Sequence, residues 1–314
     1  MKTRQQYDEL LQVLTKSQYT KDDACAAICI ITSFIFDGGA GAWQAWVGVL
    51  CDYVHSVLRR DPDPRHTFEH CAETTRFIIK VAIWFDVLAA VTTQKAPRLL
   101  EYIRKLFSPL ESPAVARGGG SLPPLELSMM SVMGCENLVL WVLAEASALS
   151  VWKCKQEARG CLSVQDLIKR AVNLEAHLDT TRASPLTYNP TLTLTDARAL
   201  SADIFRRATR VYLRSIMLGS FPNVREIVES VDEAIALLRR PQMPSSVVRS
   251  TMFAFLVCGA LTHDERHRQE LSRKLDLEEE EPAESVVGNS LSIKKLLETI
   301  WNERSKSSPR QPVQ

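Results

Sequence analysis

A long apolar run that contains one acidic residue constrains this chain more than any other feature. From Phe77 to Val91 the sequence reads FIIKVAIWFDVLAAV, in which only Lys80 and Asp86 are charged. On a helical repeat of 3.6 residues, Asp86 shares a stripe with Ile79 and is flanked by apolar residues, so its carboxylate is expected to be largely desolvated. A buried acid needs hydrogen-bond donors or an opposite charge. We expect Asp86 to contact an arginine, a lysine or a helix-end amide, although catalysis and metal binding would also satisfy it.

Composition excludes several classes of protein. The chain has 314 residues with 46% hydrophobic content, enough for a substantial core, and its 38 basic and 37 acidic residues give a net charge of +1. Such a balance is not the electrostatic footprint of a nucleic-acid-binding surface. The eight cysteines are scattered without paired spacing, which indicates reduced thiols in an intracellular protein.

Two N-terminal segments bear on targeting. The first residues, MKTRQQYDELLQ, carry charges where a signal peptide would be apolar. The apolar segment from Ala24 to Phe36 is bounded by Asp23 and Asp37 and is too short to cross a hydrocarbon core of roughly 30 Å. We therefore expect neither secretion nor membrane insertion.

Helical periodicity predicts an all-α protein, a single irregular multi-helix domain with a long Pro/Gly loop. A fixed repeat, as in helical solenoids, is not evident. Amphipathic patterns and capping residues predict helices at Val164 to Leu178 after Ser163, Asp196 to Leu218 capped by Thr195, Val224 to Leu238, and Ser246 to Ala260.

The expected domain covers residues 1–304. It includes a disordered proline- and glycine-rich loop at about 108–124, a loop at 180–193 and an acidic loop at about 276–288, followed by a disordered tail at 305–314. An amphipathic helix is expected from Tyr7 to Leu14.

Two histidine pairs have spacing that zinc can use. His66 and His70 stand four residues apart after the helix-starting Pro64, but the polar surroundings favour a solvated helix start over a two-ligand metal site. His263 and His267 repeat the spacing, yet the zinc-protease motif requires a glutamate directly after the first histidine, and Asp264 stands there.

Other chemistry-bearing patterns are incomplete. Asp22 and Asp23 resemble the start of a diphosphate-binding aspartate cluster, but the third acid falls on Ala26, so we interpret the two aspartates as favourable charges at a helix N-terminus. The glycine-rich stretches do not form a phosphate-binding loop, and no nucleophile motif is evident. We therefore predict no catalytic residue, no metal ligand and no cofactor.

The segment WFDVLAAVTTQKAP, from Trp84 to Pro97, resembles the signature helix of the fungal-specific transcription factor domain, the regulatory region of fungal binuclear zinc-cluster transcription factors. Further motifs follow in the family's order along most of the chain. They comprise a tryptophan-rich helix start, a glycine-cysteine turn, a leucine-glutamate helix, a tyrosine-leucine pair, an apolar penultimate helix and a terminal tryptophan. The residues that carry the resemblance are Trp43, Trp46, Gly48, Trp84, Phe85, Asp86, Thr92, Thr93, Pro97, Gly134, Cys135, Glu175, Tyr212, Gly259 and Trp301.

The resemblance implies a structural role for those residues in a non-catalytic regulatory domain that resides in the nucleus. It implies control of transcription through a small-molecule effector, transcriptional co-regulators or self-association, without direct binding of nucleic acid by this chain.

The chain also departs from the family pattern. Trp46 stands where the family usually has a histidine, and no C-x2-C-x6-C pattern is present to hold a zinc cluster. These departures leave open that an N-terminal half is missing from this sequence. A helical scaffold or adaptor unrelated to transcription remains the first alternative, and an all-α enzyme with an acid-lined cavity the second.

Overall fold

The computed structural model describes residues 9, 18–36, 39, 41–109, 127–180, 193–240, 243–277 and 289–307. These residues form fourteen helices and no strand, which confirms the all-α prediction. The helices are α2 (Lys21–Phe36), α3 (Trp43–Leu58), α4 (Pro64–His70), α5 (Glu73–Thr93), α6 (Leu100–Phe107), α8 (Met130–Met133), α9 (Asn137–Ala158), α10 (Val164–Thr180), α11 (Leu194–Leu218), α12 (Arg225–Leu238), α13 (Ser245–Ser250), α14 (Met252–Leu261), α15 (Glu265–Leu277) and α16 (Ser290–Ser307).

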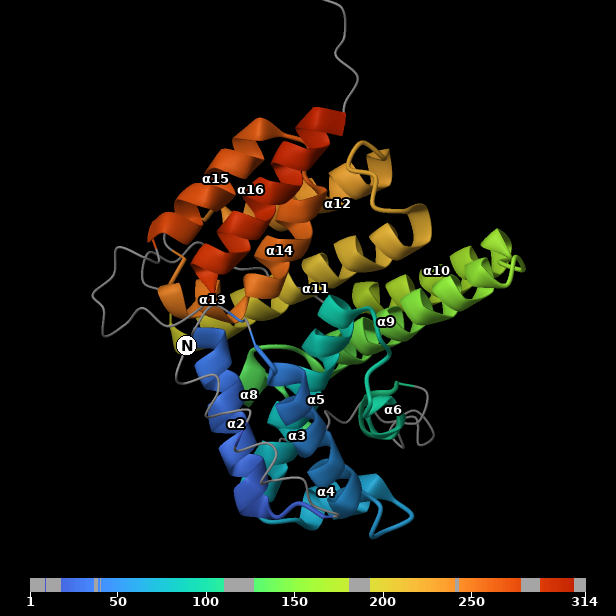
Figure 1. Ribbon diagram of the computed structural model, residues 1–314, viewed down its shortest axis with the longest axis vertical. Coiled ribbons are helices and arrows are strands. Elements are labelled where there is room, and N and C mark those ends of the chain that lie inside the picture. Colours follow the sequence, from blue (N-terminus) through green and yellow to red (C-terminus); the bar gives the residue numbers. More distant parts are fainter. Residues whose placement is uncertain are drawn as a thin grey trace, which may run out of the picture.

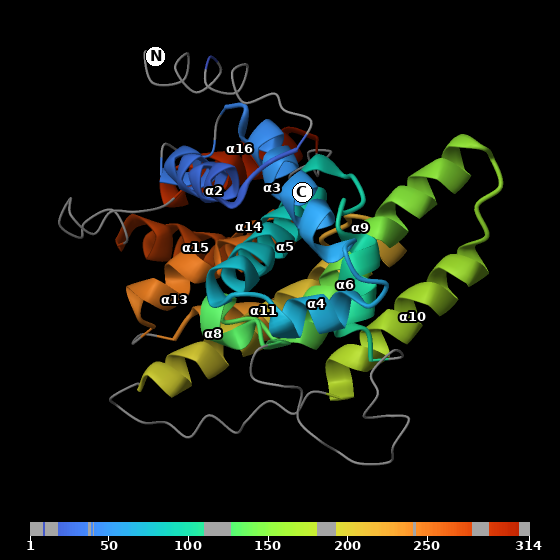
Figure 2. The same cartoon turned by 90° about the horizontal axis from the view of Figure 1, so that it is seen from below.

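The helices form two groups that α9 and α11 join. Figure 1 shows α2 to α6 gathered at one end of the molecule and α12 to α16 at the other, with α11 crossing between them. Helix α5 packs against α3 and α9, α9 packs against α11, and α11 in turn packs against α12 and α14. In Figure 2 the hairpin of α9 and α10 extends from the body of the molecule. The described helices therefore share one continuous hydrophobic core.

Helix α5 is the buried helix that the apolar run predicts, and it starts four residues earlier than Phe77, at Glu73. Both of its interior charges are buried, Lys80 at 5% and Asp86 at 3% exposed. Lys80 donates from Nζ to the backbone carbonyl of Ser128 at 2.7 Å, so the two charges have separate partners. The helix ends at Gln94, a non-glycine residue with a φ of 54°, and the chain turns back there.

A chain of aromatic side chains joins α5 to the C-terminal group. The ring of Trp84 meets Phe205 edge to face at 5.1 Å between centroids, and Phe205 stacks on Phe253 at 6.3 Å. The ring of Tyr212 also meets Phe253 edge to face, at 6.3 Å between centroids. Aromatic contacts of this geometry add to the free energy gained from burial alone, so these four rings help to fix the crossing of α5, α11 and α14.

Two of the expected helix boundaries are wrong for identifiable reasons. Helix α11 is capped by Thr193, not Thr195, because the capping box needs an acid three residues after the cap. The Thr193 hydroxyl accepts from the Asp196 amide at 3.2 Å, and the Asp196 carboxylate accepts from the Thr193 amide at 3.0 Å. Thr195 consequently lies inside the first turn.

The apolar stretch expected as one helix from Ser246 to Ala260 is divided into α13 and α14 at Thr251. Thr251 has a non-helical ψ of 20°, and its hydroxyl donates to the carbonyl of Val247 at 2.7 Å. Threonine side chains compete in this way with the backbone ladder, and the apolar periodicity does not register such a break. Smaller differences occur at α10, which continues to Thr180, and α12, whose first residue is Arg225.

Several expectations lie wholly or largely outside the described residues. They concern the helix from Tyr7 to Leu14, the loop at about 108–124, the loop at 180–193 and the part of the acidic loop beyond residue 277. At the C-terminal end, α16 continues to Ser307, past the expected domain end at 304, and residues 308–314 are not described. None of the described helices is long and apolar enough to cross a membrane.

Candidate functional site

Asp86, two turns before the end of α5, joins this helix to the beginning of α6. Its Oδ1 accepts a hydrogen bond from the backbone amide of Arg98 at 3.1 Å, and its Oδ2 accepts from the amide of Leu99 at 2.8 Å. Leu99 is the N-cap of α6, so the carboxylate binds amides that the helix itself cannot satisfy. The expectation of a helix-end amide partner is confirmed.

The environment of Asp86 shifts the pKa of its carboxyl group through two opposing effects. Burial raises the pKa of the Asp86 carboxyl, and hydrogen bonds from the amides of Leu99 and Arg98 and from the Cys51 thiol partly reverse that shift. Burial likewise raises the pKa of Cys51, which therefore stays a neutral thiol that can donate to Asp86. Two amides of the turn before α6 thus donate to this one carboxylate, and the buried Cys51 thiol of α3 also lowers its pKa.

The family-motif glycine of α3 belongs to the same junction. A Cβ atom at Gly48 would lie 2.9 Å from the guanidinium Nη1 of Arg98, so a larger residue would displace that side chain. The Arg98 Nη2 continues to Asp52 Oδ1 at 2.7 Å, one turn further along α3. The backbone amide of Arg98 therefore donates to Asp86 of α5, while its guanidinium pairs with Asp52 of α3.

A second junction unites the last two helices that carry motif residues. A Cβ at Gly259 of α14 would lie 2.7 Å from a methyl carbon of Leu297 on α16, so the close approach depends on glycine. The indole of Trp301 donates to the carbonyl of Gly259 at 2.8 Å. Arg304 also donates to the carbonyl of Ala260, and a cation at that helix end is electrostatically favourable.

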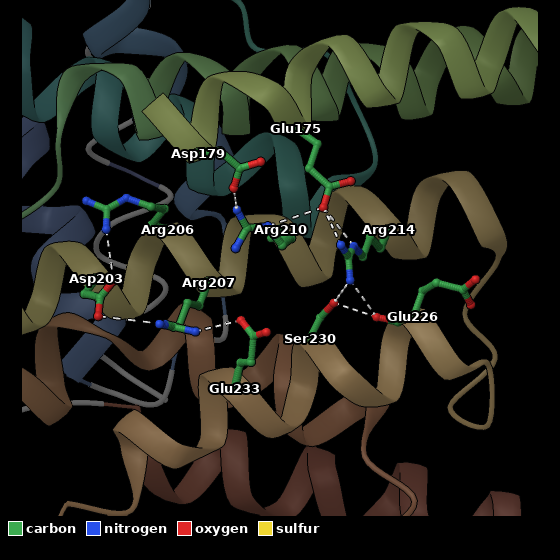
Figure 3. Close-up of polar contacts among 10 residues, drawn as sticks. All are labelled: Glu175, Asp179, Asp203, Arg206, Arg207, Arg210, Arg214, Glu226, Ser230 and Glu233. Carbon is green, nitrogen blue, oxygen red and sulfur yellow. Dashed lines mark hydrogen bonds and ion pairs between the residues drawn. The ribbon is translucent and has the colours of Figure 1, made fainter. Parts of the chain in front are cut away.

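Four arginines of α11 lie in a row, and Figure 3 shows their polar contacts with residues of α10, α11 and α12. Arg206 pairs with Asp203 at 2.9 Å and with Glu136 at the start of α9 at 2.7 Å. The next arginine, Arg207, pairs with Glu233 of α12 at 2.7 Å.

The other two arginines of the row share one acid. Glu175 of α10 forms ion pairs with Arg210 at 3.3 Å and with Arg214 at 2.7 Å, while Arg210 also pairs with Asp179. Arg214 donates further to the Ser230 hydroxyl of α12 at 2.6 Å. Glu175, which sequence analysis identified only as a motif residue, thus connects α10 to the centre of α11.

An open cleft of about 770 Å³ lies between the start of α2, the end of α3 and α4. Its lining combines aromatic, hydroxyl and charged groups, including Tyr53, Arg60, His66, His70 and Thr75. Sequence analysis did not identify this cleft, because its walls come from separate helices, including the first turn of α5 at Thr75, although it did single out the two histidines.

The family-motif residues do not converge on this cleft. Trp84, Phe85 and Asp86 lie together in α5, and the other motif residues lie at the helix crossings described above, along the buried side of a helix or at its ends. Thr92 and Thr93 donate their hydroxyls to carbonyls of the preceding turn, Pro97 is buried in the turn before α6, and Trp43 begins α3. Gly134, with a φ of 63°, ends α8, and the buried Cys135 follows it.

Trp46 is fully buried, and its indole N–H has no hydrogen-bond partner among the described residues. Within the same part of the chain, no cluster of three or more His, Cys, Asp or Glu side chains is placed to hold a metal ion.

Comparison with known proteins identifies the family. The description of the matching family is fungal specific transcription factor domain, and the match covers residues 2–311. The chain belongs to this family.

Among curated proteins, the chain is similar to regulators of fungal biosynthesis. It is 27% identical over 241 residues to the ustiloxin B cluster transcription factor ustR of Aspergillus flavus, a match covering 74% of the chain. It is 26% identical over 187 residues, 59% of the chain, to the trichothecene biosynthesis transcription regulator TRI10 of Trichoderma arundinaceum. Transcription factor ntnD of a Nectria species is 24% identical over 326 residues and matches 96% of the chain.

The chain matches 38%, 42% and 50% of the lengths of these three relatives, so it spans at most half of each. No solved structure matches the chain.

We expect Asp86→Ala to lower the free energy of unfolding by about 1 to 3 kcal/mol, because the amides of Arg98 and Leu99 lose their acceptor in a buried place. Asp86→Asn should lower it less, since one carbonyl oxygen can still accept. The matched control is Asp52→Ala, which also removes a partner of Arg98, but from an ion pair whose side chains are both 49% exposed. That change should cost less than about 1 kcal/mol. Urea unfolding measures the free energy of unfolding of all three variants. Equal losses for Asp86→Ala and Asp52→Ala would contradict the stabilising role of the hydrogen bonds from Arg98 and Leu99 to Asp86.

We expect Glu175→Gln to lower the free energy of unfolding by about 1 to 3 kcal/mol, because Arg210 and Arg214 would share a neutral partner. The control is Glu229→Gln, whose pair with Arg225 joins side chains that are 54% and 85% exposed on one helix. Its loss should be clearly smaller than that of Glu175→Gln, because solvent screens an exposed pair of this kind. Thermal and urea unfolding of the two variants give the comparison, and similar losses would show that the arginine row does not support the fold.

Proposed function

We propose that this chain is the regulatory, non-catalytic part of a transcription factor that controls a fungal biosynthetic gene cluster in the nucleus. The family match across residues 2–311 carries the proposal. The names of two relatives, the ustiloxin B cluster factor and the trichothecene regulator, support the choice of a biosynthetic target.

The chemistry of Asp86 supports a regulatory domain over an all-α enzyme. Both carboxylate oxygens bind backbone amides of the turn before α6, so the one acid in the apolar run from Phe77 to Val91 joins two elements. We propose the same structural role for the other motif residues, because Gly48, Gly259 and Trp301 lie at close helix contacts. A helical adaptor outside transcription would need another explanation for the family match.

We further propose that this chain does not itself read DNA. Each of the four arginines in the α11 row is paired with at least one carboxylate, so those charges are balanced within the domain. To bind DNA phosphates, a protein needs cationic side chains that are free to replace the counterions around the DNA. A shift assay with the isolated chain at physiological salt should therefore show no sequence-dependent binding of duplex DNA.

Regulation would proceed through an effector or a protein partner. An effector can shift a regulatory domain between two states only if it binds them with different affinity. The cleft between α2, α3 and α4 is our candidate effector site, because it offers space and mixed polar groups away from the motif residues.

The decisive experiment fuses residues 1–314 to an unrelated bacterial DNA-binding module and measures a reporter under that module's operator in a fungal host. We expect the fusion to change reporter transcription relative to the module alone, and Asp86→Ala to reduce the change because it weakens the fold. Asp52→Ala is the control that should preserve the change. A nuclear, stably expressed fusion that leaves the reporter at the level of the module alone would contradict the proposal.

A further inference from the structure

Helix α4 is held in place on one side by burial and by cations. Its own Phe68 side chain is fully buried. Arg76 donates to the carbonyls of Phe68 at 3.2 Å, Glu69 at 2.9 Å and Cys71 at 3.1 Å, so it caps the end of the helix. Arg65 reaches the carbonyl of Leu106 at the end of α6 at 3.0 Å. The short helix is therefore a fixed support rather than a frayed turn.

Two imidazole rings stand one turn apart on this support. The centroids of His66 and His70 are 4.3 Å apart, and the planes are tilted by 35°. Both rings line the cleft between α2, α3 and α4, and the His66 side chain is 59% exposed. Solutes in the cleft can reach both rings.

The hydrogen bonds of the two rings select one tautomer for each neutral imidazole. The Nδ1 of His66 lies 3.0 Å from the carboxylate oxygen Oδ2 of Asp61, and the Nδ1 of His70 lies 2.8 Å from the carbonyl oxygen of His66. A carboxylate and a carbonyl can only accept, so both Nδ1 atoms carry the hydrogen and donate it. Each Nε2 atom then retains its lone pair.

This is the arrangement in which metal-binding histidines are held. A ligating imidazole generally donates its other ring N–H to a carboxylate or a backbone carbonyl, which fixes the ring and makes the free nitrogen a better ligand. Here Asp61 and the His66 carbonyl supply those two acceptors without the need for further residues. The sequence pattern showed only the spacing of the histidines; the acceptors come from the folded turn.

We propose that His66 and His70 bind a divalent transition ion through their Nε2 atoms, with Asp61 as the positioning residue. Imidazole ligands suit Zn²⁺, Ni²⁺ and Cu²⁺, whereas Mg²⁺ and Ca²⁺ prefer oxygen. The described residues offer no cluster of three ligands, so this is a two-ligand site. Because both histidines line the cleft, water or a small coordinating molecule would fill the remaining positions on the ion.

The probe is Ni²⁺ titrated into the full chain by isothermal calorimetry. We expect His66→Gln and His70→Gln each to weaken a Ni²⁺ site by at least about tenfold, and Asp61→Asn to weaken it by about 10-fold to 100-fold through loss of ring orientation. The control is His263→Gln, an exposed histidine that also belongs to a pair four residues apart, which should leave the affinity unchanged. Equal Ni²⁺ affinity in the wild type and in the His66→Gln, His70→Gln double variant would overturn the site.

A second measurement on the wild-type chain does not depend on how the variants fold. Paramagnetic Ni²⁺ should broaden or shift the ring-proton NMR signals of His66 and His70 at the lowest additions, while the signals of His263 stay sharp. Signals of other histidines that respond first would overturn the proposal. Neither measurement depends on transcription, so failure here would leave the proposed function standing.

Discussion

The contact between Asp86 and the two amides before α6 is the interaction on which the N-terminal half of this fold depends. Asp86 is only 3% exposed, and removing a carboxylate from water costs free energy. Hydrogen bonds to an ionised group contribute roughly 1.5 to 3 kcal/mol each and offset much of that desolvation cost. The contact fixes where the chain turns after α5. It thereby positions Arg98 over Gly48 and sets α6 against α9.

The arginine row of α11 has a comparable role at the centre of the molecule. It ties α9, α10 and α12 to a helix that also packs on the aromatic rings of Phe253 and Trp84. Ion pairs depend on geometry more strongly than apolar contacts do, so they favour one arrangement of helices over close alternatives. Such a framework suits a regulatory domain, in which a ligand must shift an equilibrium between defined packings rather than deform a soft core.

The predictable part of this structure is local. The helical class, the course of α5 and the burial of Asp86 follow from periodicity, and the start of α10 follows from Ser163 and Asp166. The break at Thr251 is not predictable from the apolar pattern, because a hydroxyl that bonds its own backbone leaves no mark in it. The cap at Thr193 instead of Thr195 depends on the reciprocal hydrogen bonds between Thr193 and Asp196.

The partners across space could not be predicted from this single sequence. The amides that bind Asp86 lie 12 and 13 residues later, beyond a turn that begins at Gln94 in the left-handed conformation. Glu136 meets Arg206 across 70 positions of the chain, and no local rule joins them. The histidines of α4 show the same limit, since spacing identified them but only the folded turn placed Asp61 beside His66. The central claim is that Asp86 holds the turn before α6 by accepting from the Arg98 and Leu99 amides. Its most direct test is hydrogen exchange at single amides, compared between the wild type and Asp86→Ala. Our account predicts that exchange at Arg98 and Leu99 accelerates strongly in the variant, while the Ile103 amide, bonded within α6 to the Leu99 carbonyl, changes far less. Unchanged protection of both Arg98 and Leu99 would contradict it.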